Sequence, residues 1–281
     1  MRYPCSHAGG RWYSGDKDFF RFGTVLCRSP LTMKAMKKTH DAVSGSGSPL
    51  KKYLDVIVGR SSPAALFYFE WCVWLAPVPG ALGMVLRKVF WPRLFGSCGR
   101  GVTFGANIVV RHPSRIHLGD RVVISEQCIL DGRSSVKERT IELDDDVILS
   151  TNVMLSCKEG TIRIGRRTGV NAQTIIQSTN NCPVVIGDDC VIGQRCFIIG
   201  GGSYYTERLD VPIREQGIKP DSGVVLAADV WLGGNVTVLG GVTMGQGSVA
   251  AAGAVVTRSV EPSAVCMGVP ARVVKKRSDN G

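Results

Sequence analysis

Side chains able to do chemistry are few and scattered in this chain of 281 residues. Its ten cysteines contain no CxxC pair, and its only histidines are His7, His40, His112 and His117. This spacing argues against a zinc site and against a disulfide framework. We therefore expect reduced cysteines and no bound metal, which leaves the carboxylates as the main source of acid–base chemistry.

Residues 199–225 contain several side chains whose types can take part in acid–base chemistry. A carboxylate can accept a proton from a hydroxyl if its pKa is raised, whereas tyrosine, with an ordinary pKa of about 10, serves better as a hydrogen-bond donor. The candidates are Glu207, Asp210 and Glu215, with Tyr204 and Tyr205 as the weaker ones. Asp210 also fits a turn before Pro212, so a purely structural role stays open for it.

An aliphatic repeat of six residues organises the chain from about residue 102 onward, and neither a helix nor a simple strand has this period. Three hexads make one triangular coil, and stacked coils pair strand on strand at about 4.8 Å per layer. We expect glycines and other small residues to turn the corners. The pattern predicts an all-β parallel β-helix over residues 101–277, with inward positions at Leu118, Ile124, Leu130, Leu143, Leu149, Leu155, Ile164, Val170, Ile176, Ile186, Ile192, Ile198, Leu226, Leu232, Val238, Met244, Ala250 and Val256.

The repeat also identifies an inserted loop and a set of core cysteines. Ile198 is followed in register only by Leu226, so residues 199–225 form an inserted loop, and a connection this long in a compact solenoid is usually functional or disordered. Three cysteines fall at the fourth place after an aliphatic position, where a small side chain is needed. We expect them to fill the core rather than to bind a ligand; they are Cys128, Cys190 and Cys196.

The hexads and three closing runs resemble the left-handed β-helix hexapeptide acyltransferases. Within these they are most similar to the sugar O-acetyltransferases and the colanic-acid-type acetyltransferases of polysaccharide biosynthesis. The closing runs are Val230–Val236, Gly253–Arg258 and Gly268–Val273. The resemblance covers roughly residues 50–277, and its most specific part extends from Trp231 to Arg272.

The resemblance implies a homotrimer with acetyl-CoA as acyl donor in the groove between neighbouring solenoids. It implies direct transfer to a hydroxyl of a saccharide or lipid-linked glycan, with a histidine as base and backbone N–H groups stabilising the oxyanion. By motif position it implies coenzyme A contacts from Trp231, Gly234, Ala252, Thr257, Arg258 and Arg272. Any hexapeptide solenoid needs small residues for its own turns, so the small members of this set have two explanations.

The chain departs from the family at the catalytic base. The family histidine aligns with about Tyr204, and no histidine follows His117. His117 lies four or more layers from the loop, which is too far for proton transfer within one subunit. We expect it and His112 at the surface of the first turn. Either another loop residue takes the proton, or the solenoid is catalytically silent and binds ligands or partners; because the groove residues look intact, we favour an active O-acyltransferase.

The first hundred residues differ from the solenoid in composition. Residues 1–49 are polar and end in a Ser/Gly run, which predicts a flexible basic segment. Residues 50–100 contain an apolar stretch broken at Pro77 and Pro79, which predicts two short helices, too short to span a bilayer. These helices have two possible roles, contact with a membrane through residues 63–93 and capping of the first coil, and the two roles are compatible. Basic and aromatic residues follow, as expected beside anionic headgroups: Arg87, Lys88, Trp91 and Arg93.

The net charge of +11 lies almost wholly in this leading part of the chain. Residues 1–100 hold 15 Lys/Arg against 5 Asp/Glu, whereas residues 101–281 hold 19 against 18. A near-neutral solenoid argues against nucleic-acid binding. The first forty residues lack the charged, apolar and small-residue order of a signal peptide, so we expect a cytoplasmic protein at the inner face of the membrane.

Overall fold

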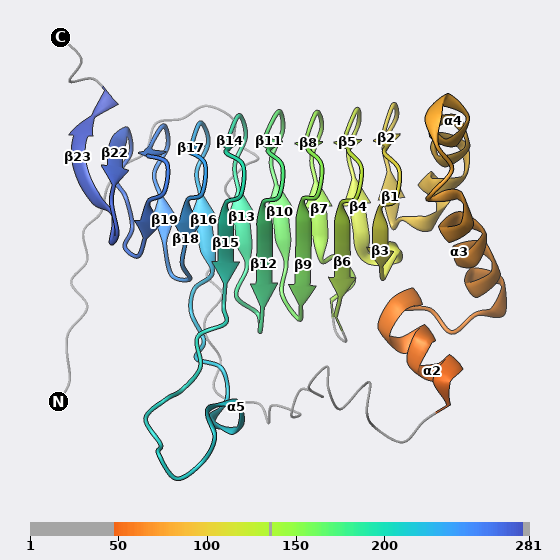
Figure 1. The fold of residues 1–281 in the computed structure, drawn as a ribbon, viewed down its shortest axis with the longest axis horizontal. Helices are drawn as coiled ribbons and strands as arrows, with labels where there is room; N and C mark the ends of the chain where they lie inside the picture. Colours follow the sequence, from red (N-terminus) through yellow and green to blue (C-terminus); the bar gives the residue numbers. More distant parts are fainter. Residues whose placement is uncertain (1–47, 135–136, 278–281) are drawn as a thin grey trace, which may run out of the picture. The chain divides into compact units, whose positions relative to one another are not determined.

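A computed structural model describes residues 48–134 and 137–277 of the chain, and these form a parallel β-helix with short helices at its N-terminal end (Figure 1). This confirms the predicted fold class. The prediction of a flexible segment at residues 1–49 falls almost entirely outside the described residues. The helical segments are α2 (Pro49–Tyr53), the π-helical turn η1 (Leu54–Val58), α3 (Pro63–Leu75), α4 (Gly80–Phe90), the 3-10 turns η2 (Trp91–Leu94) and η3 (Pro113–Arg115), and α5 (Ile213–Gln216).

Three sheets form the faces of the β-helix, and each of the seven complete coils contributes one strand to each of them. Two further strands at the C-terminal end extend one sheet, and the last of them is antiparallel. Sheet A contains β1 (Ser97–Cys98), β4 (Ile116–Leu118), β7 (Ile141–Leu143), β10 (Ile162–Ile164), β13 (Val184–Ile186), β16 (Val224–Leu226) and β19 (Thr243–Met244). Sheet B contains β2 (Thr103–Phe104), β5 (Val123–Ile124), β8 (Ile148–Leu149), β11 (Gly169–Val170), β14 (Val191–Ile192), β17 (Trp231–Leu232), β20 (Val249–Ala250), β22 (Ala264–Met267) and β23 (Arg272–Lys276). Sheet C contains β3 (Val109–Arg111), β6 (Ile129–Arg133), β9 (Met154–Lys158), β12 (Ile175–Thr179), β15 (Phe197–Gly200), β18 (Thr237–Val238) and β21 (Val255–Val256).

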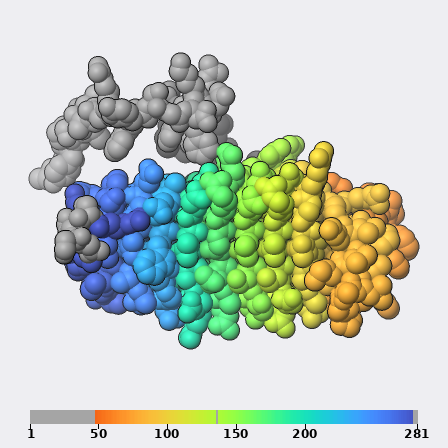
Figure 2. Space-filling model, turned by 90° about the horizontal axis from the view of Figure 1, so that it is seen from above, coloured from red at the N-terminus to blue at the C-terminus, as the bar shows by residue number. Residues whose placement is uncertain are grey.

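The aliphatic hexad positions form the interior of the β-helix. In sheet A, Ile164 lies beside Ile186 and Ile186 beside Leu226, so equivalent side chains stack from coil to coil. Every predicted inward position is buried, which confirms the repeat as the source of the core. Figure 2 shows the successive coils as bands of colour along the axis. Burial of this continuous apolar column supplies the main stabilising free energy.

Three core cysteines confirm their predicted role. Cys128, Cys190 and Cys196 are buried, and each thiol donates to a backbone carbonyl of the next coil: Ser150 at 3.1 Å, Ala227 at 3.1 Å and Gly233 at 3.2 Å. Burial raises the pKa of the Cys128 and Cys190 thiols to about 11. Thiols of this kind stay protonated and act as small core side chains.

The corners of the coil differ from the expectation that glycine and small residues turn them. At many corners a larger polar residue adopts the left-handed backbone conformation, as Asp146, Arg167 and Asn235 do with φ of 59°, 55° and 58°. Polar side chains such as Asn and Asp tolerate this region by bonding locally. Some glycines are needed for a different reason: a Cβ on Gly233 would lie 2.6 Å from the amide nitrogen of Ala252 in the next coil. At Gly233, the close stacking of successive coils therefore requires a residue without a side chain.

Helices α3 and α4 cover the open end of the first coil, so the predicted capping role is confirmed. The Arg87 guanidinium is 2% exposed and donates to the carbonyls of Val78 (2.8 Å), Phe104 (3.1 Å), Leu75 (3.2 Å) and Ala76 (3.2 Å). The buried Trp91 donates from Nε1 to the Cys72 carbonyl at 3.1 Å. These bonds tie the two helices to each other and to β2.

The burial of Arg87 and Trp91 corrects the expectation that they face lipid headgroups, because their polar atoms are used inside the cap. Lys88 and Arg93 are exposed, as that expectation requires. His112 is also buried rather than at the surface: its Nε2 lies 3.0 Å from the Asp55 carbonyl. In all three cases the partner comes from a distant segment that hexad spacing does not reveal.

The outer faces of α3 and α4 remain apolar and exposed. Phe67 and Trp74 are 76% and 77% exposed on α3, and Leu82, Val85 and Val89 are exposed on α4. Among the described residues, we find no helix with the length and apolar character needed to cross a membrane. The exposed face therefore belongs to two short helices whose opposite sides cap the β-helix.

We expect the Arg87 bonds to be essential for the cap. Replacing Arg87 with Met leaves four carbonyls without this donor and should lower the free energy of unfolding by about 3 kcal/mol. Chemical denaturation measures the change. Lys88→Met, at an exposed neighbouring site, should change it by less than about 0.5 kcal/mol; equal effects of the two substitutions would contradict the assignment.

Candidate active site

An excursion of residues 201–223 leaves the β-helix between β15 and β16 (Figure 1). Strand β13 pairs directly with β16, so the coil closes in register across the insertion. At the neck, one carboxylate joins the two ends of the excursion: Asp221 accepts from the amides of Gly201 at 3.0 Å and Gly223 at 2.7 Å. Both glycines are left-handed, with φ of 76° and 79°.

The excursion has its own hydrogen-bonded structure. Tyr204 and Ile218 form a β-bridge, and the Tyr205 amide donates to the Gly217 carbonyl at 3.1 Å. The Gln216 side chain donates to the Arg208 carbonyl at 2.6 Å. These bonds hold the two arms of the excursion together, so the acid–base candidates have defined positions.

Two of those candidates, Glu207 and Asp210, are paired with cations at the surface. Lys219 bonds the Glu207 carboxylate and holds its pKa below the usual value. Arg208 contacts both oxygens of Asp210 and lowers the pKa of that group as well. A lowered pKa makes a carboxylate a weaker base, which is the opposite of the shift that the predicted catalytic role needs.

The other two candidates, Glu215 and Tyr204, are exposed near the same excursion. Glu215 lies on α5 with its carboxylate 3.4 Å from the Arg214 guanidinium. Tyr204 is 45% exposed. Both side chains therefore lie at the solvent-exposed surface of the excursion.

The residues implied in coenzyme A binding divide between two corners of the β-helix. Gly234 and Ala252 lie in successive coils at the corner between sheets B and C, where the Gly253 amide donates to the Gly234 carbonyl at 2.9 Å. Trp231 is on the adjoining edge of sheet B and is 54% exposed. Arg272 opens β23 and pairs with Met267 at the end of β22, beside this same corner. We call these four residues the B–C corner set.

Thr257 and Arg258 lie at the other end of sheet C. They follow β21 directly and are exposed at the corner between sheets C and A. The excursion leaves from this C–A corner as well, two coils earlier, or about 10 Å along the axis. The structure thus brings the B–C corner set together, and separates it from the excursion by the width of sheet C.

The sequence does not single out the cations Arg208 and Lys219, or Asp221 at the neck. Asp221 joins the two ends of the excursion. The signal that could have found it is the pair of glycines that flank the insertion, since a carboxylate between them can bond both amides. Among the described residues, no group of three or more His, Cys, Asp or Glu side chains is arranged to hold a metal ion.

Comparison with known proteins shows similarity to hexapeptide-repeat proteins and to proteins named as acetyltransferases. The family model described as "Hexapeptide repeat of succinyl-transferase" matches residues 183–202 and 223–258, on either side of the excursion. A Staphylococcus aureus (MRSA252) protein named "Putative acetyltransferase" is 32% identical over 153 residues, which cover 51% of this chain and 73% of that protein. A Saccharomyces cerevisiae protein of the same name is 36% identical over 101 residues, or 35% of this chain and 52% of that protein.

A solved structure with a similar trace is a mutant N-acyltransferase from Bacillus cereus, in complex with dTDP and coenzyme A. It is 21% identical and superposes with a TM-score of 0.46 over 69% of this chain and 87% of that one.

We expect Asp221 to control the order of the excursion. Asp221→Ala removes both neck bonds, and should speed limited proteolysis within residues 203–217 about tenfold, since looser segments open to cleavage more often. Asp210→Ala, which removes only an exposed ion pair, is the matched control, and the protease should cleave it at the wild-type rate. Unchanged proteolysis of the Asp221 variant would show that the neck does not depend on this carboxylate.

Proposed function

This chain belongs to the hexapeptide-repeat acetyltransferase family, and from that premise we propose that it transfers an acetyl group from acetyl-CoA to a hydroxyl of a saccharide. The observation that carries the proposal is the open B–C corner. A Cβ on Gly253 would meet nothing within 4 Å, and Ala252 beside it is exposed. Small side chains next to the exposed face of Trp231 leave room for an extended pantetheine arm to lie against the coils.

The charged ends of the donor fit the residues around this corner. Arg272 is exposed beside the B–C corner and Arg258 is exposed at the far end of β21. Guanidinium groups bind phosphate oxygens through paired N–H donors, so these two arginines suit the phosphates of coenzyme A. The Trp231 ring offers an apolar surface at the B–C corner, and Thr257 offers a hydroxyl beside Arg258 at the C–A corner, across the width of sheet C.

The proposed reaction is a direct transfer. The acceptor oxygen attacks the thioester carbonyl carbon, the carbon–sulfur bond breaks, and coenzyme A leaves with the proton as the ester forms. An alcohol is a poor nucleophile until its proton is removed, so a base must sit beside it. Of the loop candidates, Glu215 lacks the strong ion pairing that weakens Glu207 and Asp210, and we assign it the role of base, with Tyr204 as a donor nearby.

We further propose that the site is completed by a second copy of the chain, in a homotrimer. The base needs desolvation that its own chain does not supply, since the whole excursion from Ser203 to Glu215 is exposed except Val211. The excursion also presents apolar side chains to solvent, including Leu209 at 97% exposure and Ile213 at 53%. Packing the excursion against the B–C corner of a neighbour buries these side chains and joins the two halves of the site.

A second candidate function is a catalytically silent solenoid that binds a ligand or scaffolds partners. The observation that favours it is the state of the excursion, which has no histidine and whose Glu207 and Asp210 have lowered pKa values. The two candidates differ in turnover, and only the transferase requires coenzyme A binding at the B–C corner.

The location we propose is the cytoplasmic face of a membrane, where lipid-linked saccharides are assembled. Its support is the apolar outer face of α3 and α4, flanked by the exposed cations Lys88 and Arg93. Short helices with an apolar face and nearby cations lie in the interface of anionic bilayers.

We expect Ala252→Trp to block the donor groove. The indole fills the space beside Trp231 and should weaken coenzyme A binding in calorimetry at least tenfold, and reduce kcat/KM for thiol release from acetyl-CoA with a panel of sugars. Ala172→Trp is the matched control, because Ala172 lies at the equivalent B–C corner three coils earlier. It should bind coenzyme A like the wild type.

The same assay separates the two candidate functions. Turnover that depends on a sugar supports the transferase, and binding without turnover supports the silent solenoid. Absence of coenzyme A binding by the wild-type protein would contradict the transferase.

We expect the apolar face to govern membrane binding. Charging it with the double substitution Phe67→Glu and Trp74→Glu should reduce flotation with phosphatidylglycerol/phosphatidylcholine vesicles more than tenfold, because two large apolar contacts are lost. Leu209→Glu makes the same kind of change on the excursion and should float normally. Equal flotation of wild type and double variant would rule out this face as the anchor.

A further inference from the structure

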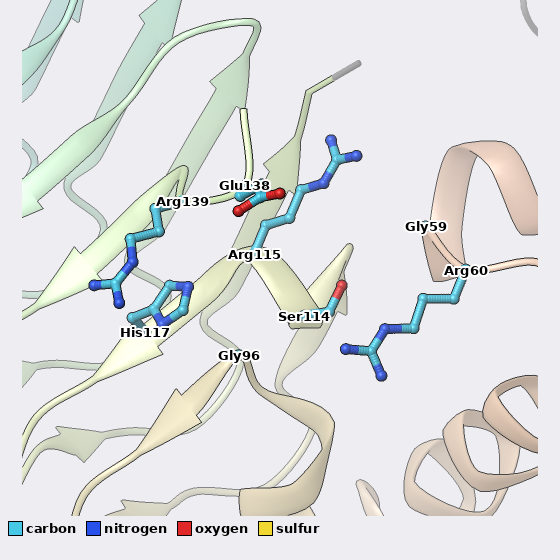
Figure 3. Close-up of a pocket in the computed structure, with 8 residues that line it drawn as sticks. All are labelled: Gly59, Arg60, Gly96, Ser114, Arg115, His117, Glu138 and Arg139. Carbon is cyan, nitrogen blue, oxygen red and sulfur yellow. The ribbon is translucent and has the colours of Figure 1, made fainter. Parts of the chain in front are cut away.

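A cavity of about 470 Å³ lies at the N-terminal end of the β-helix, where the segment after η1 meets the first coils of sheet A. Four separate segments line it, as Figure 3 shows. The lining residues are Gly59, Arg60, Gly96, Ser114, Arg115, His117, Glu138 and Arg139. Its volume is in the range of small-molecule sites.

The cavity is strongly basic. Its lining residues include three arginines, Arg60, Arg115 and Arg139, and a single acidic residue, Glu138 (Figure 3). Arg139 is only weakly engaged elsewhere, at 3.6 Å from Glu142. The cavity is open to solvent, where Arg60 is exposed, and its three cations create a local positive potential that favours an anion.

Arg115 has a donor that the described protein atoms leave without an acceptor. Its Nη1 is buried and has no hydrogen-bond partner. Burial also lowers the pKa of this guanidinium, so its charged form is poorly compensated where it stands. A buried N–H without an acceptor is costly, and an oxygen of a bound anion would satisfy it.

The walls of the cavity are held in place by close packing on two glycines. A Cβ on Gly96 would lie 2.6 Å from Cε1 of His117, and the same ring is held by a 2.9 Å hydrogen bond between Nδ1 and the Ser97 hydroxyl. Gly59 has φ of 73°, and a Cβ there would lie 2.6 Å from Nδ1 of His112. A rigid, positively charged cavity is preorganised for an anion.

We propose that this cavity binds a phosphate group carried by a small molecule or a lipid headgroup. Phosphate matches the donor set because its several oxygens can engage more than one guanidinium at once, in paired N–H contacts. The Ser114 hydroxyl and His117 add polar neighbours for the group that carries the phosphate. The volume beyond the phosphate itself fits an organic substituent.

This cavity is separate from the proposed active site. It adjoins β4 in the second coil, whereas the excursion leaves after the fifth, about 14 Å further along the axis. Loss of acetyl transfer would therefore leave the phosphate proposal standing, and the reverse also holds.

Calorimetry on the full chain with glycerol 3-phosphate tests the proposal. The wild-type protein should bind it, and Arg60→Gln and Arg115→Gln should each weaken binding about tenfold, since each removes a charge-assisted contact. Arg195→Gln makes the same change in net charge at an exposed site in the fifth coil and should bind like the wild type. Arg60 is exposed, so its variant tests the cavity even if the Arg115 variant fails to fold.

Flotation with phosphatidic acid/phosphatidylcholine vesicles separates the two sources of phosphate. A lipid ligand predicts that both cavity variants float less than the wild type, whereas Arg195→Gln floats like the wild type. A soluble ligand predicts equal flotation of all variants, together with the calorimetric difference. If Arg60→Gln and Arg115→Gln match the wild type in both measurements, or if the wild type binds neither probe, the proposal is wrong.

Discussion

Register between coils is the constraint on which the rest of this structure depends. Each strand donates and accepts along its whole length to equivalent strands above and below, so a residue of one coil must lie beside its counterpart in the next. Any insertion has to leave and return without shifting that register, because a shift by one residue would turn the aliphatic column outward. The pairing of Val184 with Val224 across the excursion shows how the chain meets this requirement.

This constraint also determines where function can be placed. Side chains that point into the column are committed to the core, so chemistry is confined to corners, outward faces and insertions. In this chain the open B–C corner and the excursion at the C–A corner lie on opposite sides of sheet C. A single coil cannot bring them together, which is why our account assigns one complete site to two copies of the chain.

The repeat made the fold predictable from sequence, since one aliphatic residue every six positions directly specifies the interior. The length of the insertion, and the small side chains at Gly234 and Ala252, were likewise visible. Arg87, His112 and Asp221 were not, because each depends on backbone groups that reach it from another segment. Arg115 and the basic cavity were missed for the same reason: three arginines at 60, 115 and 139 have no common spacing, and only the packing of η1 against β3 brings Arg60 to the cavity that the other two line.

The central claim is that donor groove and excursion come from neighbouring chains, and a crystal structure of the full chain with coenzyme A tests it most directly. Our account predicts a trimer in which coenzyme A lies against Trp231 and Ala252 of one chain and touches residues 203–217 of the next. A monomer, or coenzyme A held by a single chain away from any second excursion, would contradict it.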